Sequence, residues 1–178
     1  MNDQAEVVGT IYCGDNLAAE NPGAIVPKIV ELVSQFNPDV VVAGPAFAAG
    51  RYGLNCGRVC AEVQTTLGIP AVSGMHEENP GVDSYQTQVH IVGTRDSAAG
   101  MADAIQRMAK MAIRLAMGEE LGSPLDEGYF SMGRRVYKIS DRPAAPRAID
   151  MLLKKVKGEP FVTEWPLPKY HRVVPAPA

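Results

Sequence analysis

The fold of this chain is decided by residues 40–53, which read Val40-Val41-Val42-Ala43-Gly44-Pro45-Ala46-Phe47-Ala48-Ala49-Gly50-Arg51-Tyr52-Gly53. The unbroken apolar start, rich in valine, is typical of a strand buried on both faces. Glycine and proline then interrupt the run, and a helix is predicted from about Tyr52 to Leu67. A strand, a glycine-rich turn and a helix form the first part of a βαβ unit. Ligands of parallel sheets bind where such turns follow the strands.

Strand and helix patterns alternate on both sides of this stretch. Short apolar runs predict further strands at residues 7–12, 69–74 and 89–92, and helical spacing predicts helices at about residues 24–36 and 98–117. The expected apolar stripes are Ile25, Ile29, Leu32, Val33 and Phe36 in the first helix and Met101, Ile105, Met108, Ala112 and Leu115 in the second. This alternation favours an α/β fold, with a parallel, flavodoxin-like sheet of about four strands and helices on both faces in three layers.

The pattern changes in the last third of the chain. We expect an extended loop over residues 118–134, an edge strand at 135–139 and a final amphipathic helix from Pro143 to Gly158. Five prolines after residue 158 forbid regular structure, although Phe161, Trp165 and Tyr170 add aromatic surface there. The expected organisation is therefore an α/β substrate-binding domain at 1–158 and an extended arm at 159–178. The arm either packs on another chain, so that the protein is an oligomer or part of a complex, or begins a further domain.

Bulk composition excludes several classes of protein. The chain has 178 residues, is 46% hydrophobic and 21% charged, and carries a formal net charge of -3, which suits one globular domain. Nucleic acid is not an expected partner because there is no cluster of Lys and Arg. No stretch has the length of a transmembrane helix or the pattern of a signal peptide. Three cysteines without a disulfide framework favour a reducing compartment, so we expect a cytoplasmic protein.

Three turns follow predicted strands and lie at one edge of a parallel sheet, where they supply the candidate site. Arg51 has the fork geometry to hold a substrate carboxylate, or else it faces solvent. Glu77 or Glu78 is a candidate general base or ammonium partner. Cys13 is a candidate nucleophile or redox thiol, or else a packed thiol. The other candidate substrate-binding residues are Asp15, Asn16, Gly44, Pro45, Phe47, Tyr52, Met75, His76 and Asn79.

Neither a metal site nor a dinucleotide site is indicated by the residues of these turns. His76, Glu77 and Glu78 with Cys13 and Asp15 are possible metal ligands, but their spacing matches no compact zinc signature, and no metal site is predicted. The glycines do not form the dinucleotide fingerprint, so a Rossmann cofactor is not supported. Cys56 and Cys60 share a helix face and are interpreted as a buried pair, with a dithiol as the alternative.

The turns also carry a family resemblance. Cys13-Gly14-Asp15-Asn16, residues 43–53 and residues 74–83 resemble the N-terminal half of the large substrate-binding subunit of glycine/sarcosine/betaine reductase, the selenoprotein B family. Ser97-Ala98-Ala99-Gly100-Met101 and Phe161-Val162-Thr163-Glu164-Trp165-Pro166 are similar to it too. The resemblance implies an oxidoreductase complex that reductively cleaves the C–N bond of a small amino acid or amine. It also implies a pyruvoyl group on a partner chain, an attacking selenol, and a small carrier selenoprotein.

Family members carry the selenocysteine in their C-terminal half, and this sequence shows neither selenocysteine nor an equivalent redox motif. No cofactor is therefore expected in this chain, and a pyruvoyl group and a selenocysteine or cysteine redox centre are expected on partner chains. We expect one part of a split enzyme or a truncated product, inactive alone. The first hypothesis is a substrate-binding subunit. The alternatives are a non-catalytic scaffold subunit and a stand-alone enzyme that uses Cys13 on a small carboxylate.

Overall fold

The computed structural model describes residues 5–133 and 141–163 of the chain. The chain divides into two compact units, Met1–Arg134 and Arg135–Ala178, called here the first and second units and described separately. The strand expected at 135–139 and residues 164–178 of the expected arm lie outside the described residues. The domain boundary expected after residue 158 stays a prediction.

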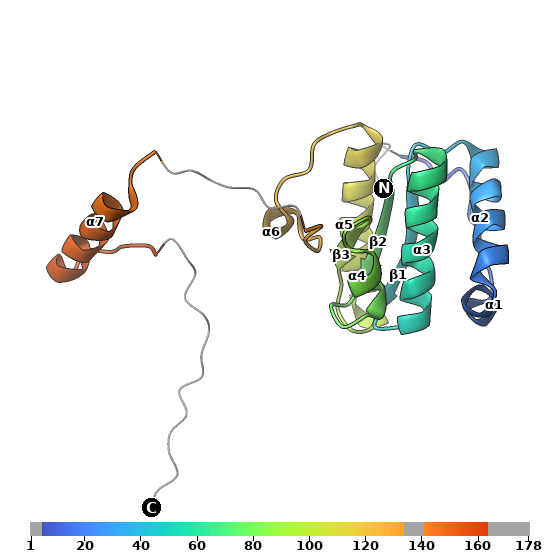
Figure 1. Cartoon of the computed structure of the whole chain (residues 1–178), viewed down its shortest axis with the longest axis horizontal. Coiled ribbons are helices and arrows are strands. Elements are labelled where there is room, and N and C mark those ends of the chain that lie inside the picture. The colour runs from blue at the N-terminus through green and yellow to red at the C-terminus, as the bar shows by residue number, and fades with distance from the viewer. Residues whose placement is uncertain (1–4, 134–140, 164–178) are drawn as a thin grey trace, which may run out of the picture. The chain divides into compact units, whose positions relative to one another are not determined.

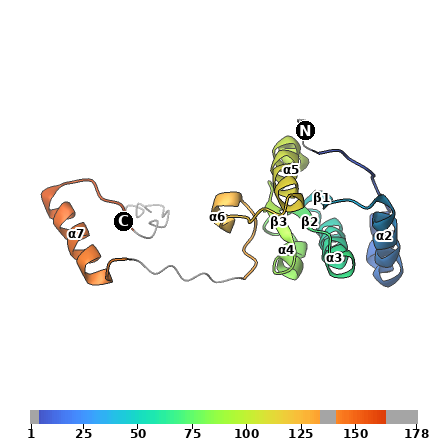
Figure 2. The same ribbon diagram turned by 90° about the horizontal axis from the view of Figure 1, so that it is seen from above.

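The first unit is built on a parallel sheet in the order β1-β2-β3. The strands are β1 (Val41–Phe47), β2 (Ala71–Met75) and β3 (His90–Gly93). The helices are α1 (Asp15–Glu20), α2 (Pro22–Phe36), α3 (Gly50–Leu67), α4 (Pro80–Tyr85) and α5 (Met101–Ala116), the last preceded by a single 3₁₀ turn, η1 (Ala98–Gly100). Helices α3 and α4 cover one face of the sheet and α5 covers the other (Figure 1, Figure 2). The predicted parallel α/β fold, with helices on both faces, is confirmed.

The strand expected at residues 7–12 is wrong, and the sheet has three strands among the described residues. Residues 5–14 have no regular secondary structure, and Val7, Val8 and Tyr12 are exposed. Gly9 lies directly against the ring of Phe36, where a Cβ atom would come within 2.6 Å of the ring. The segment thus packs against the end of α2 instead of pairing with β1. A short apolar run becomes a strand only where a partner edge and a buried face are both available.

Because no described strand pairs with its outer side, β1 is an edge strand. The expected burial on both faces is therefore wrong, and the side chain of Val42 is 48% exposed. The glycine at residue 44 has a φ of 101°, a conformation that other residues rarely adopt, and the register with β2 shifts between Ala43 and Phe47. The following peptide bond to Pro45 is cis. The end of β1 is therefore irregular at the point where the sequence predicts the ligand-binding turn.

Helix α2 buries a face that only partly matches the expected apolar stripe, because α2 packs against α3. Val33 is buried as expected and Ile29 packs beside it, together with Val26, Val30 and Val63 of α3, whereas Leu32 and Phe36 of the expected stripe are exposed. Figure 2 shows α2 beside α3, at the end of a row of helices on one face of the sheet. The buried face of α2 is turned toward a helix, and the apolar residues on its other side remain accessible.

Helix α5 follows its predicted boundaries closely but buries a shifted face. Met108 and Ala112 are buried as expected, together with Ala104 and Met111, whereas Met101 and Ile105 are exposed. Residues 118–134, expected to be an extended loop, include the short helix α6 (Pro124–Glu127). Arg114 of α5 fastens this loop, because its Nη1 lies 2.5 Å from Glu127 Oε1 and its Nε lies 2.9 Å from Glu119 Oε2.

In the second unit, the described residues form α7 (Ala144–Lys157) with short segments before and after it, at 141–143 and 158–163. The end of α7 at Gly158 is predicted correctly, because that glycine has a φ of 69° and takes the left-handed conformation that closes a helix. None of the helices in residues 5–133 and 141–163 is long and apolar enough to cross a membrane.

Candidate functional site

The turns after the strands meet at one edge of the sheet, as the parallel topology predicts. The backbone N–H of His76, after β2, donates to the carbonyl of Phe47 at the end of β1 over 3.0 Å. The N–H of Ala48 donates to the carbonyl of Asp96, after β3, over 3.2 Å. Main-chain hydrogen bonds therefore tie the three turns into one surface, called here the carboxyl edge.

Asn79 holds two of these turns together from inside. Its side chain is 1% exposed, and its Nδ2 donates to the carbonyls of Phe47 over 2.8 Å and Ala49 over 3.2 Å. Its Oδ1 accepts from the N–H of Gly81 over 2.9 Å. The buried amide thus makes three hydrogen bonds to the backbone, two through its NH₂ group and one through its oxygen, as burial of a polar side chain requires. The arrangement makes Asn79 a residue that positions the carboxyl edge.

Three residues expected to bind substrate have interior side chains. Phe47, Met75 and Asn79 are all buried, and Met75 is part of the core between the sheet and helices α3 and α4. Phe47 also has a φ of 49°, so the chain turns sharply where β1 ends. These side chains shape the edge from below, whereas Cys13, Asp15, Asn16, Arg51, Tyr52, Glu77 and Glu78 are exposed and His76 is half-buried.

Helix α1 brings the first predicted turn to the start of α3. The Nδ2 of Asn55 donates to the carboxylate Oδ1 of Asp15 over 2.8 Å and to the backbone carbonyl of Asp15 over 3.2 Å. The guanidinium of Arg51 donates to Oδ1 of Asn16. The structure therefore brings Asp15, Asn16 and Arg51 together, although residues 13–16 do not follow a strand as expected.

Asn55 is a site residue that the sequence reasoning missed. It is buried, 8% exposed, and it fixes the backbone position of Asp15. The signal was present, because Asn55 lies four residues before Val59 and eight before Val63, so that it continues their apolar stripe toward the start of α3. A polar residue in such a stripe needs a hydrogen-bond partner from elsewhere in the chain.

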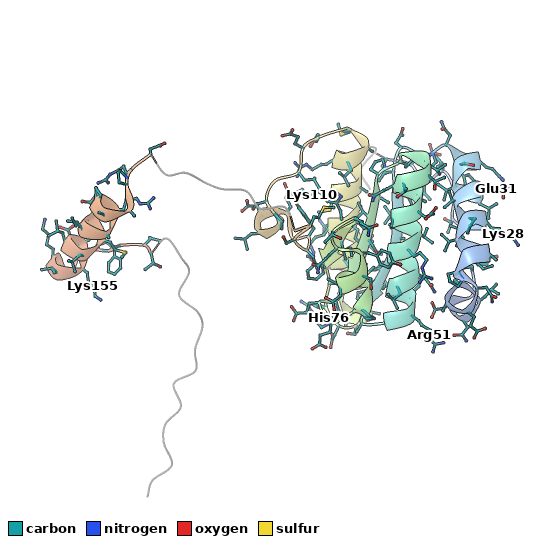
Figure 3. All side chains as sticks on the ribbon, viewed as in Figure 1. Lys28, Glu31, Arg51, His76, Lys110 and Lys155 are labelled. Atoms are coloured by element: carbon teal, nitrogen blue, oxygen red, sulfur yellow. The ribbon has the colours of Figure 1, made fainter. Side chains whose placement is uncertain are left out.

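The far side of the edge carries the residues that follow β2. His76 Nδ1 accepts a hydrogen bond from the backbone N–H of Glu78 over 3.3 Å, which holds the imidazole over its own turn. Figure 3 shows Arg51 and His76 at the same end of the first unit, on different turns. Within the described residues no group of three or more His, Cys, Asp and Glu side chains is arranged to hold a metal ion.

The phenol of Tyr52 and the buried thiol of Cys56 follow Arg51 along α3. Burial raises the pKa of the Cys56 thiol to about 12. The side chain of Tyr52 is only partly exposed, and the partial burial of its hydroxyl, followed by the neighbouring Cys56, raises the pKa of that hydroxyl to about 12. Burial also raises the pKa of Cys60, one turn further along α3. The interpretation of Cys56 and Cys60 as a buried pair is confirmed, and both are protonated at neutral pH, whereas Cys13 is exposed.

We expect the Cys56 thiol to make stability fall in alkaline solution. Above its unfolded pKa of 9.0 the unfolded chain releases the proton, while the folded chain keeps it up to about pH 12. Between these two pKa values, this thiol therefore lowers the free energy of unfolding by up to about 1.4 kcal/mol for each pH unit. Urea unfolding from pH 8 to pH 11 measures the slope, and Cys56→Ala should reduce it by that amount. Equal slopes for the two proteins would show that Cys56 ionises freely in the folded chain.

Comparison with known proteins gives one family and several relatives. The family model described as glycine/sarcosine/betaine reductase selenoprotein B matches residues 1–178. The chain is 50% identical over 175 residues to glycine reductase complex component B subunit gamma of Carboxydothermus hydrogenoformans, covering 98% of this chain and 40% of that protein. It is 45% identical over 178 residues to sarcosine reductase complex component B subunit beta of Peptoclostridium acidaminophilum, covering 100% of this chain and 41% of that protein.

A third relative is betaine reductase complex component B subunit beta of the same organism, 40% identical over 171 residues, with 95% of this chain and 39% of that protein covered. The chain thus spans about 40% of the length of these curated relatives. No solved structure matches it.

Proposed function

Because this chain belongs to the glycine/sarcosine/betaine reductase selenoprotein B family, as its motifs suggested, we propose that it is the substrate-binding part of such a reductase complex. The reaction class is the reductive cleavage of a C–N bond in a small molecule that carries a carboxylate and an amine. Relatives named for glycine, sarcosine and betaine share this family, and those three amines differ only in methylation. The carboxylate is the group that is the same in all three, so a binding site for them is expected to hold it.

The observation that carries the proposal is the convergence of three turns at the carboxyl edge, where the guanidinium of Arg51 lies beside Asp15 and Asn16. Arg51 stands at the start of α3 and is steadied by Asn16, which leaves its remaining N–H donors for a ligand. A fork of parallel N–H groups matches a carboxylate in geometry and charge. Asp15 is fixed by Asn55 beside it. The site therefore offers a fixed cation and a fixed carboxylate on adjacent elements.

The remaining roles follow the chemistry of the exposed side chains. We assign Arg51 to the substrate carboxylate, with Asp15, Asn16, Tyr52 and His76 around it. Glu77 and Glu78 are assigned to the substrate amine or its leaving group, and Cys13 is the exposed thiol available for covalent chemistry. The residues with buried side chains, together with Gly44 and Pro45, shape the turn that presents these groups.

The proposal places the redox chemistry on other chains. The pyruvoyl group and the selenocysteine or cysteine redox centre belong to partner chains, and the arm at 159–178 is assigned to contact a second chain. A cytoplasmic location and a flavodoxin-like arrangement of the whole sheet belong to the same proposal. The second is supported by the parallel sheet with helices on both faces.

Arg51→Lys tests the assignment of the carboxylate. Lysine keeps the charge but loses the planar fork, so we expect a loss of roughly 1.5–3 kcal/mol, the scale of a hydrogen bond to a charged group. At about 1.4 kcal/mol per decade, this is a tenfold or greater weakening of binding. Calorimetric titration of glycine, sarcosine and betaine into the 178-residue chain measures it.

Arg58→Lys is the matched control, because Arg58 lies two turns further along the same helix, away from the carboxyl edge. It should bind all three compounds as the wild type does. If Arg51→Lys and Arg58→Lys bind equally well, Arg51 has no place in the site. If the wild-type chain binds none of the three, the scaffold hypothesis replaces the substrate-binding one.

A further inference from the structure

Helix α7 of the second unit presents an apolar face that no described residue of that unit covers. Ile149, Leu152, Leu153 and Val156 lie at spacings of three and four residues, which align them on one side of a helix. Their side chains are 55%, 59%, 49% and 76% exposed. These four residues are called here the α7 stripe. Four neighbouring aliphatic side chains left in water are typical of an interaction surface.

The chain that follows α7 turns to the other side of the helix. After Gly158, Phe161 and Val162 border a hollow of about 230 Å³ together with residues of the polar side of α7, among them Met151 and Lys154. On the same side of α7, Arg142, which precedes the helix, forms an ion pair of 2.8 Å with Asp150. The neighbouring described segments therefore pack on the polar side and leave the α7 stripe open.

Positive charge borders the stripe. Helix α7 carries four basic side chains, Arg147, Lys154, Lys155 and Lys157, against one acidic side chain, Asp150. The 3.6-residue period places Lys155 on one flank of the stripe and Lys157 on the other. Lys155 is labelled on the exposed helix in Figure 3. A surface that receives the stripe must therefore combine an apolar floor with acidic residues at its rim.

We propose that α7 docks, by its stripe, into an apolar groove with an acidic rim on another protein chain of the reductase complex. The proposal rests on the proposed function for the existence of that complex. The mode is that of an amphipathic helix laid into a groove, with anchors at i, i+3, i+4 and i+7. Aliphatic anchors supply the buried contact, and the flanking lysines supply orientation and speed of association.

Two other occupants fit the stripe less well. A second copy of α7 would bring two sets of four cations together, with a single acidic residue on each helix to offset them. A membrane surface is entered by helices with leucine on the apolar side and lysine on the polar side, but electrostatic attraction to anionic lipid is opposed by the net charge of -3 that the whole chain carries. The relatives are named as components of complexes, which is the setting in which a protein groove is available.

Leu152→Asp tests the docking. The chain is immobilised, and the purified remaining chains of the reductase complex from the same organism are the probe. The substitution should weaken binding about tenfold or more, because it places a charge at a central anchor. Leu125→Asp is the matched control, since Leu125 is a leucine of α6 that is 94% exposed, and it should bind as the wild type does. Lys155→Glu with Lys157→Glu should slow association most at low salt, since screening weakens with falling ionic strength.

Four other results would overturn the docking proposal. Equal binding by Leu152→Asp and the wild type overturns the proposal. So does co-sedimentation of the chain with vesicles containing anionic phosphatidylglycerol, if Leu152→Asp abolishes it, or a self-association that Leu152→Asp abolishes without any partner. If the wild-type chain binds no chain of the complex, the docking proposal fails. Failure of the substrate assignment shows separately, in the Arg51→Lys titration, which α7 variants should leave unchanged.

Discussion

Asn79→Asp should lower the free energy of unfolding by roughly 3–5 kcal/mol, the cost of leaving a buried charge without a partner. The two side chains have the same shape, so no cavity or clash is created. Aspartate still accepts from the N–H of Gly81, but it cannot donate to the carbonyls of Phe47 and Ala49. A carboxylate then faces two carbonyl oxygens in a site where the side chain is 1% exposed. Urea unfolding followed by far-ultraviolet circular dichroism measures the change.

Asn21→Asp is the control for this substitution. Asn21 is exposed and precedes α2, and its side chain makes no capping hydrogen bond. A negative charge at that end of a helix is neutral or mildly stabilising, by at most about 1 kcal/mol. A loss below about 1 kcal/mol for Asn79→Asp would show that water reaches the carbonyls. In that case Asn79 would not hold the carboxyl edge together.

The second large effect is expected from Gly81→Ala, because helices α3 and α4 touch at this glycine. A Cβ atom on residue 81 would lie 2.7 Å from the backbone carbon and oxygen of Gly53 and 2.8 Å from the sulfur of Met75. The thioether is able to move, but the backbone of α3 moves only with the helix. Overpacking of this kind costs about 1–3 kcal/mol, and we expect the upper end of that range. The midpoint of urea unfolding reports it directly.

Gly23→Ala is the matched control, since it adds the same methyl group to another helix. A Cβ atom at residue 23 of α2 meets nothing within 4 Å. Alanine there should be neutral or stabilising by up to about 1 kcal/mol, the difference in helix propensity. If both alanine variants unfold at the same urea concentration, the approach of α4 to α3 is looser than these distances indicate.

Elements with strong local patterns were predictable from the sequence. The strands at β1, β2 and β3 each combine an apolar run with flanking turn residues, and α3 ends at Gly68 with a φ of 69°, as a terminal glycine predicts. The exposed cation at residue 51 and the buried cysteines of α3 were also predictable, since residue type and helical period determine them. The family was evident from motifs that are contiguous in the chain.

Features that depend on a partner far away in the chain were not predictable in this way. Residues 7–12 have the pattern of a strand, but a strand exists only when another edge accepts its hydrogen bonds, and Phe36 of α2 receives Gly9 instead. The stripe of α2 was right at Val33 and wrong at Leu32 for the same reason, because the side of α2 that is buried is the one that faces Val63 of α3.

The site shows this division most clearly. Sequence alone determined that turns follow β1 and β2 and that Arg51 lies near the end of β1, although it wrongly placed residues 13–16 after a strand. Only the tertiary structure decided that Asn55 holds Asp15, that Asn16 steadies Arg51 and that Asn79 is interior. Local backbone preferences act over a few residues, so they are written in contiguous patterns. The pairing of a buried amide with two carbonyls 30 and 32 residues away depends on how whole elements pack, and packing is a property of the folded chain.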